Sequence, residues 1–160
     1  MSAGGLRKMS NRVFAAFGVG LNRNEMVKHC PTAKLLGTTE LKNYRLMFRG
    51  GNANAVATIE KMKGGSVPAL LWEINSQDEA ALDRWIGVPY LYRKTTVKTR
   101  LNGAAMDAFV YILIANKPQN RPSAFYYSTL LEGYKVAGFD TEILKAAIVD
   151  GSSEGSIAQS

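Results

Sequence analysis

The chain has 160 residues, enough for one domain with a buried core, and its apolar content of 46% is that of a globular protein. No apolar run is long enough to cross a membrane, and residues 1–12 lack the apolar stretch of a secretory signal, so the cytoplasm is the default location. The net charge of +7 favours anionic partners, and the single cysteine excludes an internal disulfide.

The apolar pattern predicts one domain over residues 12–150, between a flexible basic tail at 1–11 and a linker-like, flexible tail at 151–160. Alternating or continuous apolar runs, rich in β-branched and aromatic residues, predict the strands. They lie at about 12–17, 34–38, 42–49, 55–60, 67–74, 90–100 and 105–115. Asn102-Gly103 is a hairpin turn signal between the last two.

Capping residues and periodicity predict the helices. Ser76 and Glu79 indicate a capping box that begins a helix ending at Gly87. Further helices are expected at 123–138, after Asp140 and, as a short turn, near 24–29. Many strands with a few helices indicate an α+β domain.

His29 and Cys30 are the single histidine and the single cysteine, and they are adjacent. A zinc site usually takes four ligands, or three plus water, so these two residues predict no metal site. Adjacent side chains tend to point apart, which also disfavours a Cys–His nucleophile. We therefore expect structural roles for both, and nothing in the chain calls for a cofactor.

Residues 17–22 read FGVGLN and follow the first predicted strand. Two interpretations stay open: a nest of backbone N–H groups that binds an anion, and an ordinary tight turn. The segment is not a dinucleotide-binding fingerprint, because the third glycine and the parallel βαβ unit are missing.

Basic residues gather at 23–49 and 90–100. Residues 90–94 read YLYRK, which interleaves aromatic residues with cations as nucleic-acid surfaces do. A strand with aromatics on one side and solvated cations on the other explains the same pattern, so nucleic acid is not the expected partner. Arg49 and Arg93 are expected to contact an anionic ligand, because a planar guanidinium suits phosphate or carboxylate.

Residues 14–22 read FAAFGVGLN, and residues 82–89 read LDRWIGVP. The first resembles a strand and loop with the motif Tyr-Gly-Ser-Asn, and the second a segment with Leu-Asp, two variable residues and Glu-Gly. Together with segments at 44–48, 55–59, 67–74, 90–94 and 122–134, in familiar order and spacing, they resemble the gamma-glutamyl cyclotransferase-like family. The resemblance implies its fold, an α+β domain with a small, strongly curved mixed β-barrel flanked by helices.

The resemblance also implies a reaction. The α-amine of a γ-glutamyl substrate loses a proton and attacks its own δ-carbonyl, which yields 5-oxoproline and a free amine. A glutamate accepts that proton and returns it to the leaving group. In this chain the glutamate position is Ile86, which can never accept a proton. In the loop the tyrosine, serine and asparagine are Phe17, Val19 and Gly20, and only Gly18 matches.

These departures predict a pseudoenzyme that binds a small anionic molecule such as a nucleotide or a peptide-like metabolite, and sequestration of that molecule is one version of this function. Apolar walls would suit a flat ligand such as a base or an aromatic ring. The alternative is an active cyclotransferase with a displaced base, for which Asp83 and Glu73 are the candidates. No membrane partner is expected, and self-association into a homo-oligomer stays open. The predicted ligand site comprises Phe17, Gly18, Val19, Gly20, Leu21, Arg49, Trp85, Ile86, Tyr92, Arg93 and Tyr126.

Overall fold

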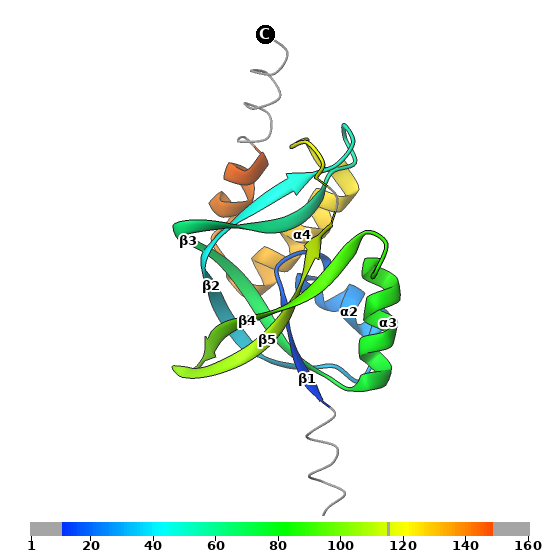
Figure 1. Ribbon diagram of the computed structural model, residues 1–160, viewed down its shortest axis with the longest axis vertical. Coiled ribbons are helices and arrows are strands. Elements are labelled where there is room, and N and C mark those ends of the chain that lie inside the picture. The colour runs from blue at the N-terminus through cyan, green and yellow to red at the C-terminus, as the bar shows by residue number, and fades with distance from the viewer. Residues whose placement is uncertain (1–10, 115, 149–160) are drawn as a thin grey trace, which may run out of the picture.

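The computed structural model describes residues 11–114 and 116–148, which contain one five-stranded sheet in the order β2-β3-β1-β5-β4 (Figure 1). The predicted tails at 1–11 and 151–160 lie outside the described residues, apart from Asn11. No helix within the described part of the chain is long and apolar enough to cross a bilayer.

The first strand, β1 (Arg12–Ala16), lies in the middle of the sheet. It is antiparallel to β3 (Val56–Ile74) and parallel to β5 (Ala104–Leu113). The ring of Phe14 stacks on that of Phe109 of β5, with centroids 5.4 Å apart. Because β1 is flanked on both sides, the loop that follows it is held deep in the molecule, and this loop carries much of the candidate site.

Two long strands replace the four predicted at 34–38, 42–49, 55–60 and 67–74. β2 (Lys34–Arg49) pairs with β3 along its whole length, with register shifts at Leu35/Gly37 and Lys42/Tyr44. At the second shift Asn43 has a φ of 67°, and its side chain accepts a hydrogen bond from the Gly64 N–H at 3.0 Å. The gaps expected at 39–41 and 61–66 are thus part of two continuous strands, and the irregularity at Asn43 is accommodated as a β-bulge.

The predicted hairpin at Asn102-Gly103 is confirmed: it joins β4 (Tyr92–Leu101) to β5, with positive φ at both turn residues. β4 begins two residues later than predicted, because Tyr90 lies in a turn and is 92% exposed. The predicted end of β5 at 115 falls on a residue outside the described part.

The sheet is curled but does not close into the predicted barrel. Its two edges, β2 and β4, meet through side chains: the hydroxyls of Thr39 and Thr99 are 2.6 Å apart, and the Thr39 hydroxyl donates to the Arg100 carbonyl at 2.7 Å. No backbone ladder joins these edges within residues 11–114 and 116–148. The curl gathers residues from all parts of the chain around one core.

The helices confirm the predicted positions. They are α2 (Arg23–His29), α3 (Ser76–Ile86), α4 (Ala124–Ala137) and residues 141–148, with a 3-10 turn η1 (Val19–Leu21) after β1. The left-handed glycines Gly87 and Gly138 end α3 and α4, as expected of C-caps. Asp140 caps the last helix through the Glu142 N–H at 3.0 Å.

The start of α3 corrects the predicted capping box. Asn75, not Ser76, is the N-cap, since its side chain accepts from the Asp78 N–H at 2.8 Å. Glu79 does not reach back to the cap; its carboxylate instead accepts from the Arg12 guanidinium at 2.8 Å. Glu79, which the local sequence assigned to the cap, therefore forms a long-range ion pair with Arg12 instead.

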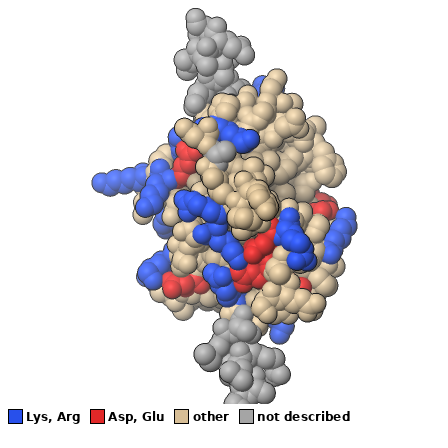
Figure 2. Space-filling model, turned by 45° about the vertical axis from the view of Figure 1, so that its right-hand side comes forward, with Lys and Arg blue, Asp and Glu red and all other residues tan. Residues whose placement is uncertain are grey.

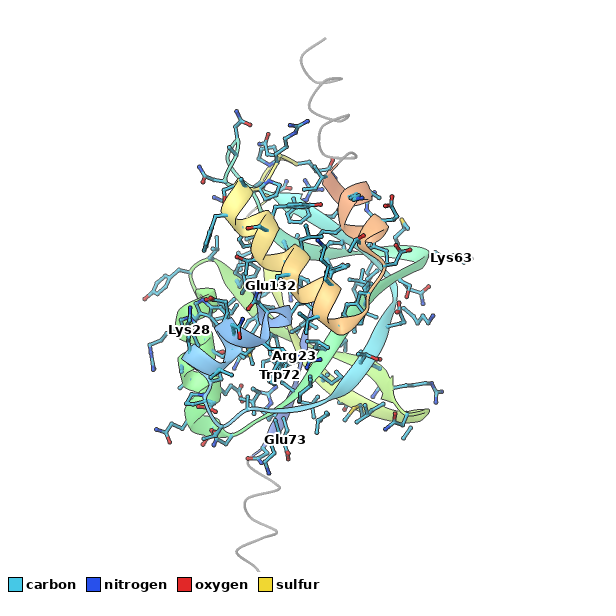
Figure 3. All side chains as sticks on the ribbon, turned by 180° about the vertical axis from the view of Figure 1, so that it is seen from behind. Arg23, Lys28, Lys63, Trp72, Glu73 and Glu132 are labelled. Carbon is cyan, nitrogen blue, oxygen red and sulfur yellow. The ribbon has the colours of Figure 1, made fainter. Side chains whose placement is uncertain are left out.

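Asn22 fastens η1 and α2 to α4. Its side chain caps α2 through the Glu25 N–H at 3.2 Å and donates to the Thr129 carbonyl at 3.1 Å and to Glu132 at 2.6 Å. Figure 3, seen from behind, shows Glu132 on the side of α4 that faces α2. This clamp positions the loop after β1 from outside the sheet.

We expect Asn22→Ala to lower the free energy of unfolding by about 2 kcal/mol, since it removes an N-cap and two part-buried hydrogen bonds to α4. Chemical denaturation measures the loss. The matched control is Asn24→Ala, an exposed asparagine in the same helix, which should change stability by less than about 0.5 kcal/mol. Equal effects of the two substitutions would contradict the clamp.

Candidate functional site

A cavity of about 290 Å³ lies between the loop after β1, the last turn of α3 and three tyrosines from β4, β5 and α4. The loop contributes four of the predicted site residues: Phe17, Gly18, Val19 and Gly20. The Gly18 carbonyl accepts from the Leu21 N–H at 2.9 Å, which closes the 3-10 turn and presents its first residues to the cavity.

Gly20 is required by packing. A Cβ built there would lie 2.8 Å from the Phe14 ring and 2.9 Å from the Cβ of Ala16, closer than real contacts allow. The Gly20 carbonyl also accepts from the indole N–H of Trp72 at 3.1 Å. The asparagine that the resemblance expects at this position would collide with β1, so the glycine is part of how this chain packs its loop.

α3 places two further predicted residues, Trp85 and Ile86, in the cavity wall. Leu82, one turn earlier, is fully buried and anchors this side of the helix in the core. The Trp85 ring stacks on the His29 ring of α2, with centroids 3.9 Å apart and planes inclined by 9°. The wall at the expected glutamate position is therefore hydrocarbon and aromatic.

Tyr92 and Tyr126, also predicted, flank the backbone of Ala57. The Tyr92 hydroxyl donates to the Ala57 carbonyl at 2.8 Å, and the Ala57 N–H donates to the Tyr126 hydroxyl at 3.0 Å. Burial raises the pKa of Tyr126 to about 12 and raises the pKa of Tyr92 further above its usual value. Both phenols therefore keep their protons at neutral pH.

The displaced-base candidates do not line the cavity. Asp83 faces it only through Tyr111, whose hydroxyl donates to Asp83 at 2.6 Å, and the Lys94 ammonium holds the same carboxylate at 3.0 Å. Lys94 also pairs with Glu79, and although burial acts against it, these hydrogen bonds raise the pKa of Lys94. Glu73 accepts from the side chain of Asn11 at the far end of β1, away from the cavity.

Three predicted site residues lie elsewhere. Leu21 is fully buried in the core behind the loop. Arg49 pairs with Glu60 and donates to the Lys117 carbonyl at 2.9 Å. Arg93 is exposed on β4, where the strand's alternation turns it away from Tyr92.

Five lining residues were not predicted: Phe14, Val56, Ala57, Leu91 and Tyr111. Four are apolar side chains that look like any core residue in the sequence. Tyr111 lies in a run of strand residues, and only the pairing of β5 with β1 and β4 brings it to the cavity. No lining residue within the described part of the chain carries a carboxylate, an imidazole or a cation.

The basic residues do not form a separate patch on the face that Figure 2 shows; acidic side chains lie between them. Ion pairs such as Arg12–Glu79, at 2.8 Å, and Lys98–Asp107, at 2.9 Å, explain this mixing. Part of the cationic charge is thus balanced locally, outside the cavity.

Buried tyrosines predict cooperative alkaline unfolding. Burial raises the pKa of Tyr92, Tyr111, Tyr126 and Tyr134 above the usual 10.0, so the unfolded chain loses these protons first. Stability is then complete below about pH 10 and falls as the pH rises beyond it. Tyrosinate absorbance and circular dichroism, followed together against pH, should show these phenols ionising with unfolding. Full ionisation of a chain with native dichroism would contradict their burial.

The fold is shared with several solved structures. Curated protein sequences give no match. Among solved structures, a gamma-glutamyl cyclotransferase and an uncharacterized human protein each superpose with a TM-score of 0.76, 22% identity and 86% of both chains covered. YkqA from Bacillus subtilis gives 0.73 and 16% identity over 91% of this chain and 55% of its own. These identities establish the fold alone.

A comparison of the sequence with models of protein families identifies the family. Residues 16–136, well over half of the chain, match the model of the family described as gamma-glutamyl cyclotransferase, AIG2-like. This stretch runs from the end of β1 to the end of α4 and includes the loop, α3 and the tyrosines that enclose the cavity. The chain therefore belongs to the AIG2-like gamma-glutamyl cyclotransferase family.

Proposed function

We propose that this chain is a non-catalytic member of its family that holds a small molecule in the cavity. The observation that carries the proposal is Ile86, which occupies the expected glutamate position and lines the cavity. A general base must lie within hydrogen-bond reach of the proton it takes, and a side chain of pure hydrocarbon cannot do this.

The other lining groups support the same proposal. Apart from backbone, hydrocarbon and the indole of Trp85, which is no base, the lining offers the hydroxyls of Tyr92, Tyr111 and Tyr126. Burial keeps the pKa of each above its usual value, so at neutral pH none is a phenolate that could accept a proton. A bound γ-glutamyl compound would stay intact, and the expected behaviour is occupancy, including sequestration, without turnover.

The lining favours an uncharged or only partly charged ligand. Aromatic rings and Ile86 provide walls on which a flat ring can stack, whereas a buried anion would find no lysine or arginine side chain in the lining. A nucleotide or a peptide-like metabolite fits this chemistry if its flat or apolar part enters and its charged part stays in solvent.

A thermal-shift screen tests the proposal with three sets of compounds: flat uncharged heterocycles, nucleotides and γ-glutamyl amides. A ligand present at 100 times its Kd stabilises the folded state by about 2.7 kcal/mol, which raises Tm by several degrees. Ile86→Trp, which fills the cavity from its own wall, should abolish the shift, and Val136→Trp on an exposed face of α4 should not. The absence of a shift with every set would refute the proposal.

A second candidate is an active cyclotransferase with a displaced base. The contact between Asp83 and the Tyr111 hydroxyl favours it, because a proton taken by the phenol oxygen could leave along that hydrogen bond. Release of 5-oxoproline by the wild type, lost in both Asp83→Asn and Tyr111→Phe, would support this candidate against the first.

A further inference from the structure

One polar group in the cavity has a defined hydrogen-bond direction. The Tyr111 hydroxyl donates its single proton to Asp83 at 2.6 Å, and the Lys94 ammonium holds the other oxygen of that carboxylate at 3.0 Å. Burial and this hydrogen bond raise the pKa of Tyr111 well above its usual value, so the proton stays on the phenol. With the proton committed to Asp83, the phenol oxygen has only a lone pair to offer a ligand.

The other two phenols are engaged differently. Tyr92 donates its proton to the Ala57 carbonyl, a neutral acceptor, whereas Tyr126 accepts from the Ala57 N–H and keeps its own proton free of that bond. Tyr111 instead donates to a carboxylate, and a hydroxyl that donates to a charged acceptor becomes the stronger acceptor itself. Tyr111 is thus the lining hydroxyl best prepared to receive a hydrogen bond.

We infer that the cavity selects flat, uncharged ligands that carry an N–H or O–H donor, which the Tyr111 oxygen accepts. This inference rests on the proposed binding function and names its ligand class. A heteroaromatic lactam or another ring with an exocyclic or ring N–H has this chemistry.

An ammonium group fits less well than a neutral donor. Arg12 and Lys94 lie 4.7 and 5.3 Å from the centre of the Phe109 ring, which packs edge-on against Tyr111. These two cations pair with Glu79 and Asp83. A cation in the cavity would therefore find its nearest carboxylates already paired, while it gives up its own hydration. A neutral N–H group loses much less hydration free energy when it enters the cavity.

The experiment compares 2-quinolinone with coumarin, which share one ring framework and one carbonyl and differ by N–H against O. Kd values from NMR titration of the wild-type chain should favour 2-quinolinone by about 3- to 10-fold, the ratio expected for one hydrogen bond. Tyr111→Phe should bring the two Kd values together. The control is Tyr127→Phe, which follows Tyr126 on α4 but lies outside the lining and should keep the preference.

The outcomes separate the two claims. Equal Kd values in the wild type, or a preference that survives in Tyr111→Phe, would overturn the inference and leave the binding function standing. If neither probe binds at millimolar concentration, and the thermal-shift screen also finds no ligand, both fall. The wild-type ratio requires no substitution, so the test holds even if Tyr111→Phe folds poorly.

Discussion

Replacing Ile86 by glutamate is expected to give the chain a measurable rate of 5-oxoproline release from a γ-glutamyl amide. The substitution puts a carboxylate on the cavity wall, at the position where the resemblance to the family expects the glutamate that transfers the proton. A positioned general base contributes about 10²–10⁴-fold, and we expect the lower end, because the loop lacks the serine and asparagine of the family motif. Adding Val19→Ser should raise the rate further.

The control for this prediction is Ile86→Gln, which has nearly the same shape and no titratable group. It should release no more 5-oxoproline than the wild type. Returning Gly20 to asparagine is not a useful addition, because a side chain there would push into Phe14 and Ala16. If Ile86→Glu folds and releases 5-oxoproline no faster than Ile86→Gln, the missing glutamate does not explain a lack of activity.

Gly133→Ala is expected to destabilise the protein more than any other small substitution on α4. A Cβ at this position would lie 2.8 Å from the backbone and Cβ of Leu21, so either η1 or α4 must move. Alanine would gain about 1 kcal/mol from helix propensity, but overpacking against backbone costs roughly 1–3 kcal/mol or more, and the clash should prevail. Urea denaturation gives the change in the free energy of unfolding.

The same substitution should weaken ligand binding, because residues 18–20, next to Leu21, line the cavity. Gly51→Ala is the matched control: a Cβ there meets nothing within 4 Å, and stability and binding should both stay close to wild type. Were Gly133→Ala as stable as Gly51→Ala, the close approach of α4 to the loop would be wrong.

Local signals in the sequence predicted most of the elements, and eight of the thirteen residues that line the cavity were among those predicted. The loop at 17–20 and the end of α3 were found because motif spacing marks them, and Gly87 and Gly138 end their helices as expected. Contacts that depend on strand pairing left no local signal. Tyr111 reaches the cavity only through the register of β5, and Arg49 was predicted there although Glu60, its partner on β3, holds it elsewhere.

The most direct test is a single-turnover assay of the wild-type chain, in excess over a γ-glutamyl amide, with 5-oxoproline followed by mass spectrometry. We predict no release above that of the Ile86→Trp variant, in which the cavity is filled, while the amide is recovered intact. Release that depends on an open cavity and on Tyr111 or Asp83 would show that this site turns its substrate over, contrary to the binding function proposed for it.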